Sequence, residues 1–413
     1  MNQESNNHAS LKSQVGELKR RQSEMHDLVH KRHQLIVVGN GFDLACGLKS
    51  KYFDFFGSRL EQIDAITTYW RQPWCDTVRE SDLTLWDFML RMKRGSNWCK
   101  VEEVMGSWVL PPANGVDAKD TYVERTLQKI RHYPFADPNS DPVTCNGRLE
   151  DEQDDQEYML SNVARFIWME EGRKAAVHMD RTALLSLLWK ELRKLERLFS
   201  AYLADQVAQT STYFSDATAL LTKLMDDELP WADKDGGDTS LLTFNYTQPF
   251  LHLDCGIEED AIVNIHGNLQ GEVVFGVDGT DCMGDLDALP FTKTYRVASM
   301  GTKMAKSLYD TATGGIGNSK TGAIKFFGHS LGEADYAYFQ SIFDGINLYG
   351  GNTKLIFYYR PWQGVTEDEV RADMVRRVAR LLSTYGKTLD NKDHGKNLMH
   401  KLLLEGRISV KRV

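Results

Sequence analysis

Six short apolar segments, separated by turns and helical patterns, constrain the fold of this chain more than any other feature. They are QLIVV (34–38), SLLTF (240–244), AIVNI (261–265), EVVF (272–275), AIKFF (323–327) and KLIFYY (354–359). Short, continuously apolar runs are typical of strands that are covered on both faces. Because strands that alternate with helices usually form parallel sheets, we expect an α/β fold with a mainly parallel, Rossmann-like sheet.

Several other segments have the three-to-four-residue spacing of apolar side chains that predicts amphipathic helices. Residues 180–208 have the clearest pattern, and residues 213–226 and about 366–385 have similar ones. The basic residues after 385 form a C-terminal tail in this prediction. Residues 48–110 are rich in aromatic side chains and are expected to be mostly helical and core-forming.

Charge and composition exclude several classes of function. The chain has 49 Lys and Arg against 58 Asp and Glu, a net charge of −9, so direct nucleic-acid binding or attachment to a membrane surface is not expected. No apolar stretch is long enough to span a membrane, and the polar N-terminus has no signal-peptide core, so we expect a cytoplasmic protein. The six cysteines include no C-x2-C pair, and no metal site is expected.

A glycine turn follows the first predicted strand and is the first of four candidate sites. Gly39, Asn40, Gly41, Phe42 and Asp43 form it, and glycines let a backbone approach a phosphate closely. Leu44 replaces the third glycine of the dinucleotide-binding pattern, which disfavours an ordinary nicotinamide dehydrogenase. Asp43 would contact a ribose or cap the helix, and a plain strand-to-helix turn is the alternative for the whole segment.

Two further candidates are single polar residues after strands. Asn245 follows LLTF, and its amide can orient a water molecule or a ribose hydroxyl, or cap a helix. His266 follows AIVNI and precedes Gly267, and it can act as a general base or have a structural role.

The fourth candidate follows AIKFF. Gly328 and Ser330 lie in a turn where the serine hydroxyl can bind a ribose or phosphate oxygen. Glu333 and Asp335 either bind the ligand or stabilise the start of the next helix. All four candidates follow predicted strands, and the carboxyl edge of an open α/β sheet is where ligands bind.

These patterns predict a chain with three parts. Residues 1–33 form an N-terminal amphipathic helix, packed on its own domain or in a short coiled coil. Residues 34–47 and 238–413 form the Rossmann-like nucleotide-binding core. Residues 48–237 form a mostly helical insertion with an acidic loop near 111–157, which is a surface insertion or a binding tail.

In order along the chain, GNGFDLACGL, TFNYT, NIHGN, VVFGVD, FTKTYR and FFGHSLGEADYAYF resemble motifs of the AbiH family of bacterial phage-defence proteins. The resemblance runs from about residue 34 to residue 360, and it implies a role in abortive infection. The segment NWCKVE also fits, with Glu102 at the expected place and Lys100 where the family is expected to have an acid.

The motifs are also similar, more distantly, to sirtuin-like NAD-binding domains. This similarity places the nicotinamide-pocket asparagine at Asn245, the general base at His266 and a ribose-phosphate turn at Gly328 to Ser330. The absence of cysteine pairs for a zinc module argues against protein deacylation.

The resemblances together imply a NAD glycohydrolase that uses NAD as a substrate, not as a bound cofactor. They also imply an infection-triggered activator and a homo-oligomer. A nucleotide-sensing or interaction module without catalysis is the alternative, and a nuclease is a weaker third.

Overall fold

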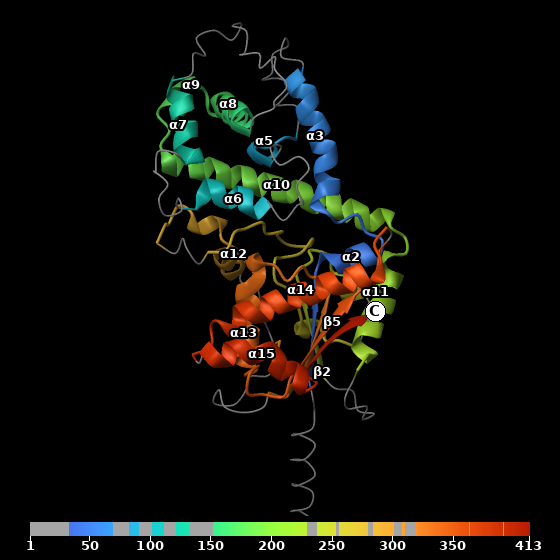
Figure 1. The fold of residues 1–413 in the computed structure, drawn as a ribbon. Helices are drawn as coiled ribbons and strands as arrows, with labels where there is room; N and C mark the ends of the chain where they lie inside the picture. The colour runs from blue at the N-terminus through green and yellow to red at the C-terminus, as the bar shows by residue number, and fades with distance from the viewer. Residues whose placement is uncertain are drawn as a thin grey trace, which may run out of the picture.

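The computed structural model describes most of the chain. The described residues are 33–68, 82–90, 101–110, 121–132, 152–228, 238–252, 256–279, 284–300, 308–309, 319–362, 364–390 and 392–413. In these ranges a layer of helices lies against one end of a sheet that is flanked by further helices (Figure 1). The N-terminal helix predicted for residues 1–33 lies outside the described residues, apart from His33, which begins strand β1.

The sheet has six strands in the described residues, all parallel, in the order β3-β2-β1-β4-β5-β6. The strands are β1 (His33–Val38), β2 (Asp238–Thr243), β3 (Ile262–Asn264), β4 (Thr321–Phe327), β5 (Lys354–Tyr359) and β6 (Ile408–Arg412). This arrangement confirms the predicted α/β fold with a parallel, Rossmann-like sheet.

Helices cover both faces of the sheet, because successive side chains of a strand point to opposite faces. Leu35 and Val37 of β1 pack in one apolar cluster, and Ile36 and Val38 pack in another on the opposite face. The first cluster includes α13 (Tyr336–Gly345), α14 (Glu367–Gly386) and α15 (Lys392–Leu404), and the second includes α2 (Asn40–Ala45) and α11 (Tyr213–Asp226). Burial on both faces explains why the strands are continuously apolar in the sequence.

The strand order reverses direction between β1 and β4. From β1 the chain continues to β2 and β3 on one side, and it then crosses to β4, β5 and β6 on the other side. In doubly wound sheets, ligands bind in the crevice at the carboxyl ends of the strands where the order reverses. The turns that follow β1 and β4 therefore define the place to look for a site.

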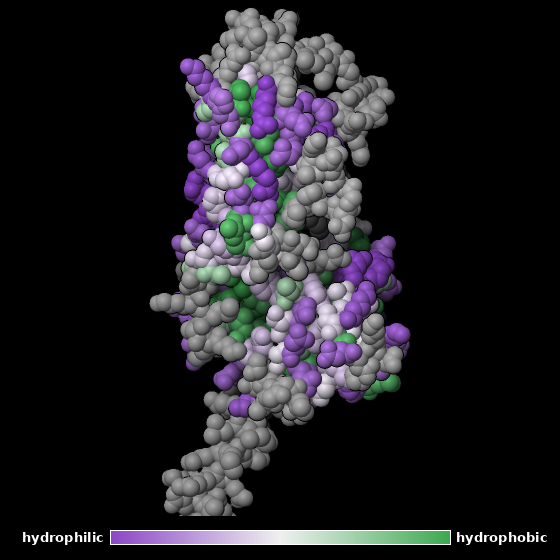
Figure 2. Space-filling view, turned by 90° about the vertical axis from the view of Figure 1, so that its left-hand side faces the viewer, coloured by the Kyte–Doolittle hydropathy of each residue, from purple (hydrophilic) through white to green (hydrophobic). Residues whose placement is uncertain are grey.

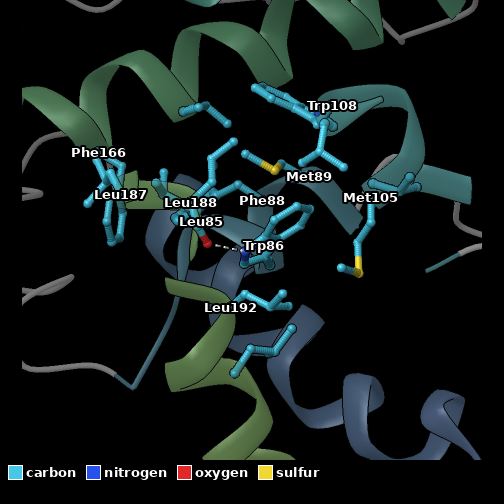
Figure 3. Close-up of a cluster of buried hydrophobic side chains, with 14 of the residues drawn as sticks. Leu85, Trp86, Phe88, Met89, Met105, Trp108, Phe166, Leu187, Leu188 and Leu192 are labelled. Carbon is cyan, nitrogen blue, oxygen red and sulfur yellow. Dashed lines mark hydrogen bonds between the residues drawn. The ribbon is translucent and has the colours of Figure 1, made fainter. Parts of the chain in front are cut away.

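The helical layer lies between β1 and β2 in the sequence and has its own core. Its helices are α3 (Tyr52–Thr68), α5 (Leu85–Leu90), α6 (Val101–Val109), α7 (Tyr122–His132), α8 (Glu152–Glu171), α9 (Arg173–Val177) and α10 (Arg181–Gln209). Trp86 is fully buried in this core, and its indole nitrogen donates to the carbonyl of Leu188 at 2.9 Å (Figure 3). Hydrophilic residues cover much of the visible face of the layer (Figure 2).

The three helices with the clearest sequence patterns are confirmed with small shifts at their ends, as α10, α11 and α14. The aspartate Asp180 caps α10 by accepting a hydrogen bond from the backbone nitrogen of Ala183 at 2.8 Å. Helix α14 begins with a capping box formed by Thr366 and Glu369. Among the described residues, no helix has the length and apolar character needed to cross a membrane.

Three sequence predictions differ from the structure. The segment EVVF (272–275) is not a strand of the sheet, because Val274 donates to the His266 carbonyl and Phe275 donates to the Glu196 carboxylate instead. The loop predicted near 111–157 is helical where it is described, in α7 and the beginning of α8. The basic C-terminal tail forms α15 and edge strand β6.

Candidate functional site

The turns after β1 and β4 pack directly against each other. The backbone nitrogen of Gly41 donates to the carbonyl of Gly328 at 2.7 Å, and that of Gly39 donates to Phe327 at 3.1 Å. A Cβ atom at Gly41 would lie 2.6 Å from the Cα atom of Gly328, which itself has φ +72. Glycine is therefore required at both positions for the two turns to meet, whatever ligand they also approach.

The other residues of the first turn have different surroundings. Asn40 is exposed, and its side-chain oxygen accepts a hydrogen bond from the Ser50 hydroxyl at 2.5 Å. Phe42 is fully buried and packs edge-on against Phe250 and Phe327. The structure thus places Asn40 at the surface of the turn and Phe42 in the core beneath it.

Asp43 is a buried carboxylate that joins three segments. Its two oxygens accept hydrogen bonds from the hydroxyls of Tyr213 and Thr247, each at 2.8 Å. It does not cap α2, whose N-cap residue is Gly39 and which has no side-chain cap. Burial raises the pKa of Asp43 from its usual value near 3.8 to about 6, although the two hydroxyls partly oppose the shift.

Asn245 and His266 each follow the end of a strand, β2 and β3. The last pair in the register of these strands is Thr243 with Asn264, and each residue lies two positions beyond it. Asn264 fixes the first turn, because its amide donates to the carbonyls of Asn245 at 2.9 Å and Thr247 at 3.1 Å. Both sequence-predicted residues therefore lie at the carboxyl ends of neighbouring strands.

The side-chain amide of Asn245 is buried without a hydrogen-bond partner. The residue is 4% exposed, and neither its Oδ1 nor its Nδ2 atom makes a hydrogen bond within the described structure. The Asn245 side chain does approach Asp43 and lowers the pKa of that carboxyl, but without the geometry of a formed hydrogen bond. Buried polar groups are nearly always paired, so an unpaired amide at this edge indicates a place for a polar ligand or water.

Five charged or titratable side chains, His266 among them, meet at this edge, and we call them the carboxylate cluster. Asp335 is at its centre, with Oδ1 lying 2.8 Å from Lys293 Nζ and 3.3 Å from His266 Nε2. Its Oδ2 lies 3.3 Å from His329 Nε2. Lys293 also reaches Glu102 on α6, at 2.6 Å. The members are Glu102, His266, Lys293, His329 and Asp335.

A family model described as "Bacteriophage abortive infection AbiH" matches residues 35–359. The chain belongs to the AbiH family. The match extends from β1 to the end of β5 and includes every member of the carboxylate cluster. Membership makes this chain an abortive-infection protein of the kind that defends against bacteriophage. Searches of curated proteins and of solved structures find no match for it.

The two histidines of this AbiH chain differ in the use of their ring nitrogens. His329 Nδ1 accepts a hydrogen bond from the backbone nitrogen of Leu331 at 2.9 Å, so in the neutral ring the proton lies on Nε2, facing Asp335. Both nitrogens of His329 are therefore engaged by the protein. His266 Nε2 is close to Asp335 but not aligned for a hydrogen bond. Of the two histidines, His266 is therefore the one whose ring nitrogens are not both engaged by other protein groups.

The cluster holds its members in defined charge states. Burial, followed by the charge of Lys293, lowers the pKa of His266 and keeps the ring neutral near pH 7. Burial alone would raise the pKa of Asp335, but the two histidines and Lys293 outweigh it and hold that pKa well below its usual range. Burial raises the pKa of Glu102. Burial opposes the charge of Lys293, yet its two carboxylate partners raise its pKa.

The remaining predicted residues lie around this edge. Ser330 is exposed, and its hydroxyl accepts from the backbone nitrogen of Gly332 at 3.3 Å. Gly267 has φ +83, and a Cβ atom there would overlap the Glu272 carbonyl, so glycine is required by the turn itself. Glu333 lies in the short helix η7 (Glu333–Asp335), and its side chain is outside the described part of the structure.

Sequence reasoning missed the roles of Lys293 and His329. Lys293 lies in the motif FTKTYR, at the start of α12 (Lys293–Ser299), and nothing in its spacing links it to Glu102 or Asp335. His329 lies directly between Gly328 and Ser330, and only its position in a polar turn after a strand could have indicated it.

The buried Asp43 predicts a measurable dependence of stability on pH. Its pKa is raised in the folded protein, so the folded state binds more protons than the unfolded state between about pH 4 and pH 6. The free energy of unfolding should therefore fall as pH rises through this window. The loss should reach about 3 kcal/mol relative to Asp43→Asn, which has a similar shape, accepts from one hydroxyl and does not titrate. Urea unfolding of both proteins at several pH values tests this, and parallel pH profiles would contradict it.

Proposed function

We propose that this protein is an enzyme that cleaves NAD into nicotinamide and ADP-ribose during phage infection. The observation that carries the proposal is the buried, unpaired amide of Asn245, which lies with His266 at the carboxyl edge next to the glycine turns. A dinucleotide that lay across the reversal of strand order would extend from the glycine turns toward this pair.

The charge of the cluster suits such a reaction. Two carboxylates, Glu102 and Asp335, face the single ammonium group of Lys293, and His266 is neutral near pH 7. Cleavage of the bond between ribose C1′ and nicotinamide builds positive charge on the ribose. A nearby excess of negative charge stabilises that charge, and it favours a substrate whose nicotinamide ring is itself cationic.

The proposed step uses water as the nucleophile. Asn245 orients the water molecule, and His266 accepts its proton as the water oxygen bonds to C1′. The C1′–nitrogen bond breaks, and its electron pair remains on nicotinamide, which leaves neutral. The exposed Asn40 of the glycine turn and the Ser330 hydroxyl would hold the phosphates and riboses.

Regulation is part of the proposal, because unchecked loss of NAD would harm the cell that makes the enzyme. We place an infection-derived activator, or assembly into a homo-oligomer, upstream of turnover.

The test is direct measurement of nicotinamide. Purified full-length protein is incubated with NAD, with and without lysate from phage-infected cells, and nicotinamide and ADP-ribose are quantified by chromatography. Equal amounts of the two products are expected, with His266→Ala as the inactive comparison. Stoichiometric binding of intact NAD without product, under every condition, would replace the enzyme proposal with a nucleotide-sensing role.

A further inference from the structure

We propose that Asp335 is a positioning residue that directs the Nε2–H group of His266 toward itself and so makes Nδ1 the atom that accepts the proton. Lys293 holds the carboxylate in place for this purpose. The inference rests on the function proposed above, in which His266 is the base. It assigns Asp335 a different role from the ligand contact that its sequence position suggests.

The geometry around His266 supports this choice of atom. Nε2 lies 3.3 Å from Oδ1 of Asp335, and a carboxylate can only accept hydrogen bonds. A neutral imidazole carries one proton, so the tautomer with the proton on Nε2 gains this contact and leaves the Nδ1 lone pair free. The alignment is poor in this state, and contacts of this kind commonly tighten when substrate binds.

The Asp335 carboxylate already contacts three side chains, which argues against a role for Asp335 in binding ribose. Oδ1 is shared by Lys293 and His266, and Oδ2 faces His329. These contacts use most of the acceptor capacity of one carboxylate. Asp335 is also largely buried, with 14% of its side chain exposed. Its surroundings are those of a group that orients other side chains.

Lys293 connects the positioning residue to the helical layer. Its ammonium group lies 2.8 Å from Asp335 and 2.6 Å from Glu102 on α6. It therefore holds the same carboxylate oxygen, Oδ1, that faces His266. The titratable groups that face His266 come from four elements and the turn after β4. They are Asp335 of η7, Lys293 of α12, His329 of that turn, Tyr338 of α13 and, through Lys293, Glu102 of α6.

Nitrogen NMR of the imidazole rings tests the proposal without any substrate. Full-length protein labelled with ¹⁵N-histidine is compared with Asp335→Asn and Lys293→Met, and His266→Gln identifies the signals of His266. We expect Nε2 protonated and Nδ1 unprotonated in the wild type at neutral pH. In Asp335→Asn the two tautomers should mix, and the pKa of His266 should fall by about one unit or more. In Lys293→Met that pKa should rise, because a nearby positive charge is removed.

The opposite directions of these two shifts separate positioning from general loss of structure. Asp373→Asn, at an exposed ion pair on α14, is the matched control and should change neither the tautomer nor the pKa. Protonation of Nδ1 in the wild type, or an unchanged tautomer in Asp335→Asn, would overturn the proposal. If Asp335→Asn does not fold, the protonated ring nitrogen of His266 in the wild type decides the question.

Kinetics provide a second measurement that a ligand-binding role would not reproduce. A positioning role predicts that Asp335→Asn lowers kcat for NAD cleavage about 10²-fold or more, with KM changed less than about threefold. A raised KM with unchanged kcat would instead make Asp335 a binding residue. If the wild type does not cleave NAD, the proposed function fails, and the imidazole measurement still decides the positioning role.

Discussion

Replacement of His266 by alanine is expected to lower the rate of NAD cleavage about 10²–10⁴-fold, the usual contribution of a general base. The fold should survive, because Asp335 keeps Lys293 and His329 as partners when this ring is removed. The ring nitrogen that faces Asp335 makes no aligned hydrogen bond, so its loss leaves no broken bond behind. Thermal unfolding and nicotinamide release, measured on the same preparations, test both parts.

Two further variants sharpen this experiment. His266→Gln keeps a polar side chain of similar length but cannot accept a proton at neutral pH, so it should be as inactive as alanine. His178→Ala changes an exposed histidine at the end of α9 and should keep full activity. Full turnover in both His266 variants, with unchanged melting temperatures, would remove this residue from the mechanism.

Replacement of Glu196 by alanine is expected to destabilise the protein by about 3–5 kcal/mol, the usual cost of leaving one member of a buried ion pair without its partner. Glu196 of α10 binds Arg296 of α12 through two contacts, at 2.8 and 3.0 Å, with both side chains at most 3% exposed. Its carboxylate also accepts from the backbone nitrogen of Phe275 at 2.8 Å. The variant would leave the Arg296 guanidinium buried, with the face of Trp189 4.5 Å from it as a weak substitute.

A double variant distinguishes the cost of an orphaned charge from the value of the pair. Glu196→Leu combined with Arg296→Leu removes both charges, so it should be less destabilising than Glu196→Ala alone. Some loss remains, because the Phe275 backbone nitrogen loses its acceptor. Urea unfolding curves of the single and double variants give the comparison. A double variant that loses the sum of the single losses would show that the two side chains contribute independently, which would contradict the explanation by an orphaned charge.

The central strands could be predicted from the sequence because a strand that is buried on both faces is a continuous run of apolar residues. In β1 every residue from Gln34 to Val38 is buried, so an apolar run directly reports a central strand. EVVF (272–275) has the same composition without being a strand of the sheet, since its apolar residues join the core of the helical layer instead. Strand β6 contains Ser409, Lys411 and Arg412 and is only partly buried at the edge, so its pattern was hidden.

Candidate site residues could be predicted from the sequence where a polar residue directly follows a predicted strand. His266 and Asn245 were identified because each is a polar residue just past an apolar run, and the parallel register places them at the ends of neighbouring strands. Lys293 was not identified, and Glu102 was singled out only through the family resemblance. They come from α12 and α6, and Lys293 joins Glu102 to Asp335 only after the helical layer has packed. The spacing of these residues along the sequence does not indicate that they are in contact in the fold.

The contact between Gly41 and Gly328 also determines when the carboxyl edge of the sheet can form while the protein is being translated. The first turn leaves the ribosome early, and its partner follows only after the helical layer, β2 and β3 have all been made. At about 5–20 residues per second, the first turn waits roughly tens of seconds for the second. A product that terminates before Gly328 has neither the second turn nor His329 and Asp335. Translation that stops before Gly328 therefore yields a chain without the assembled carboxyl edge, and every site residue is present only in chains that extend through Asp335.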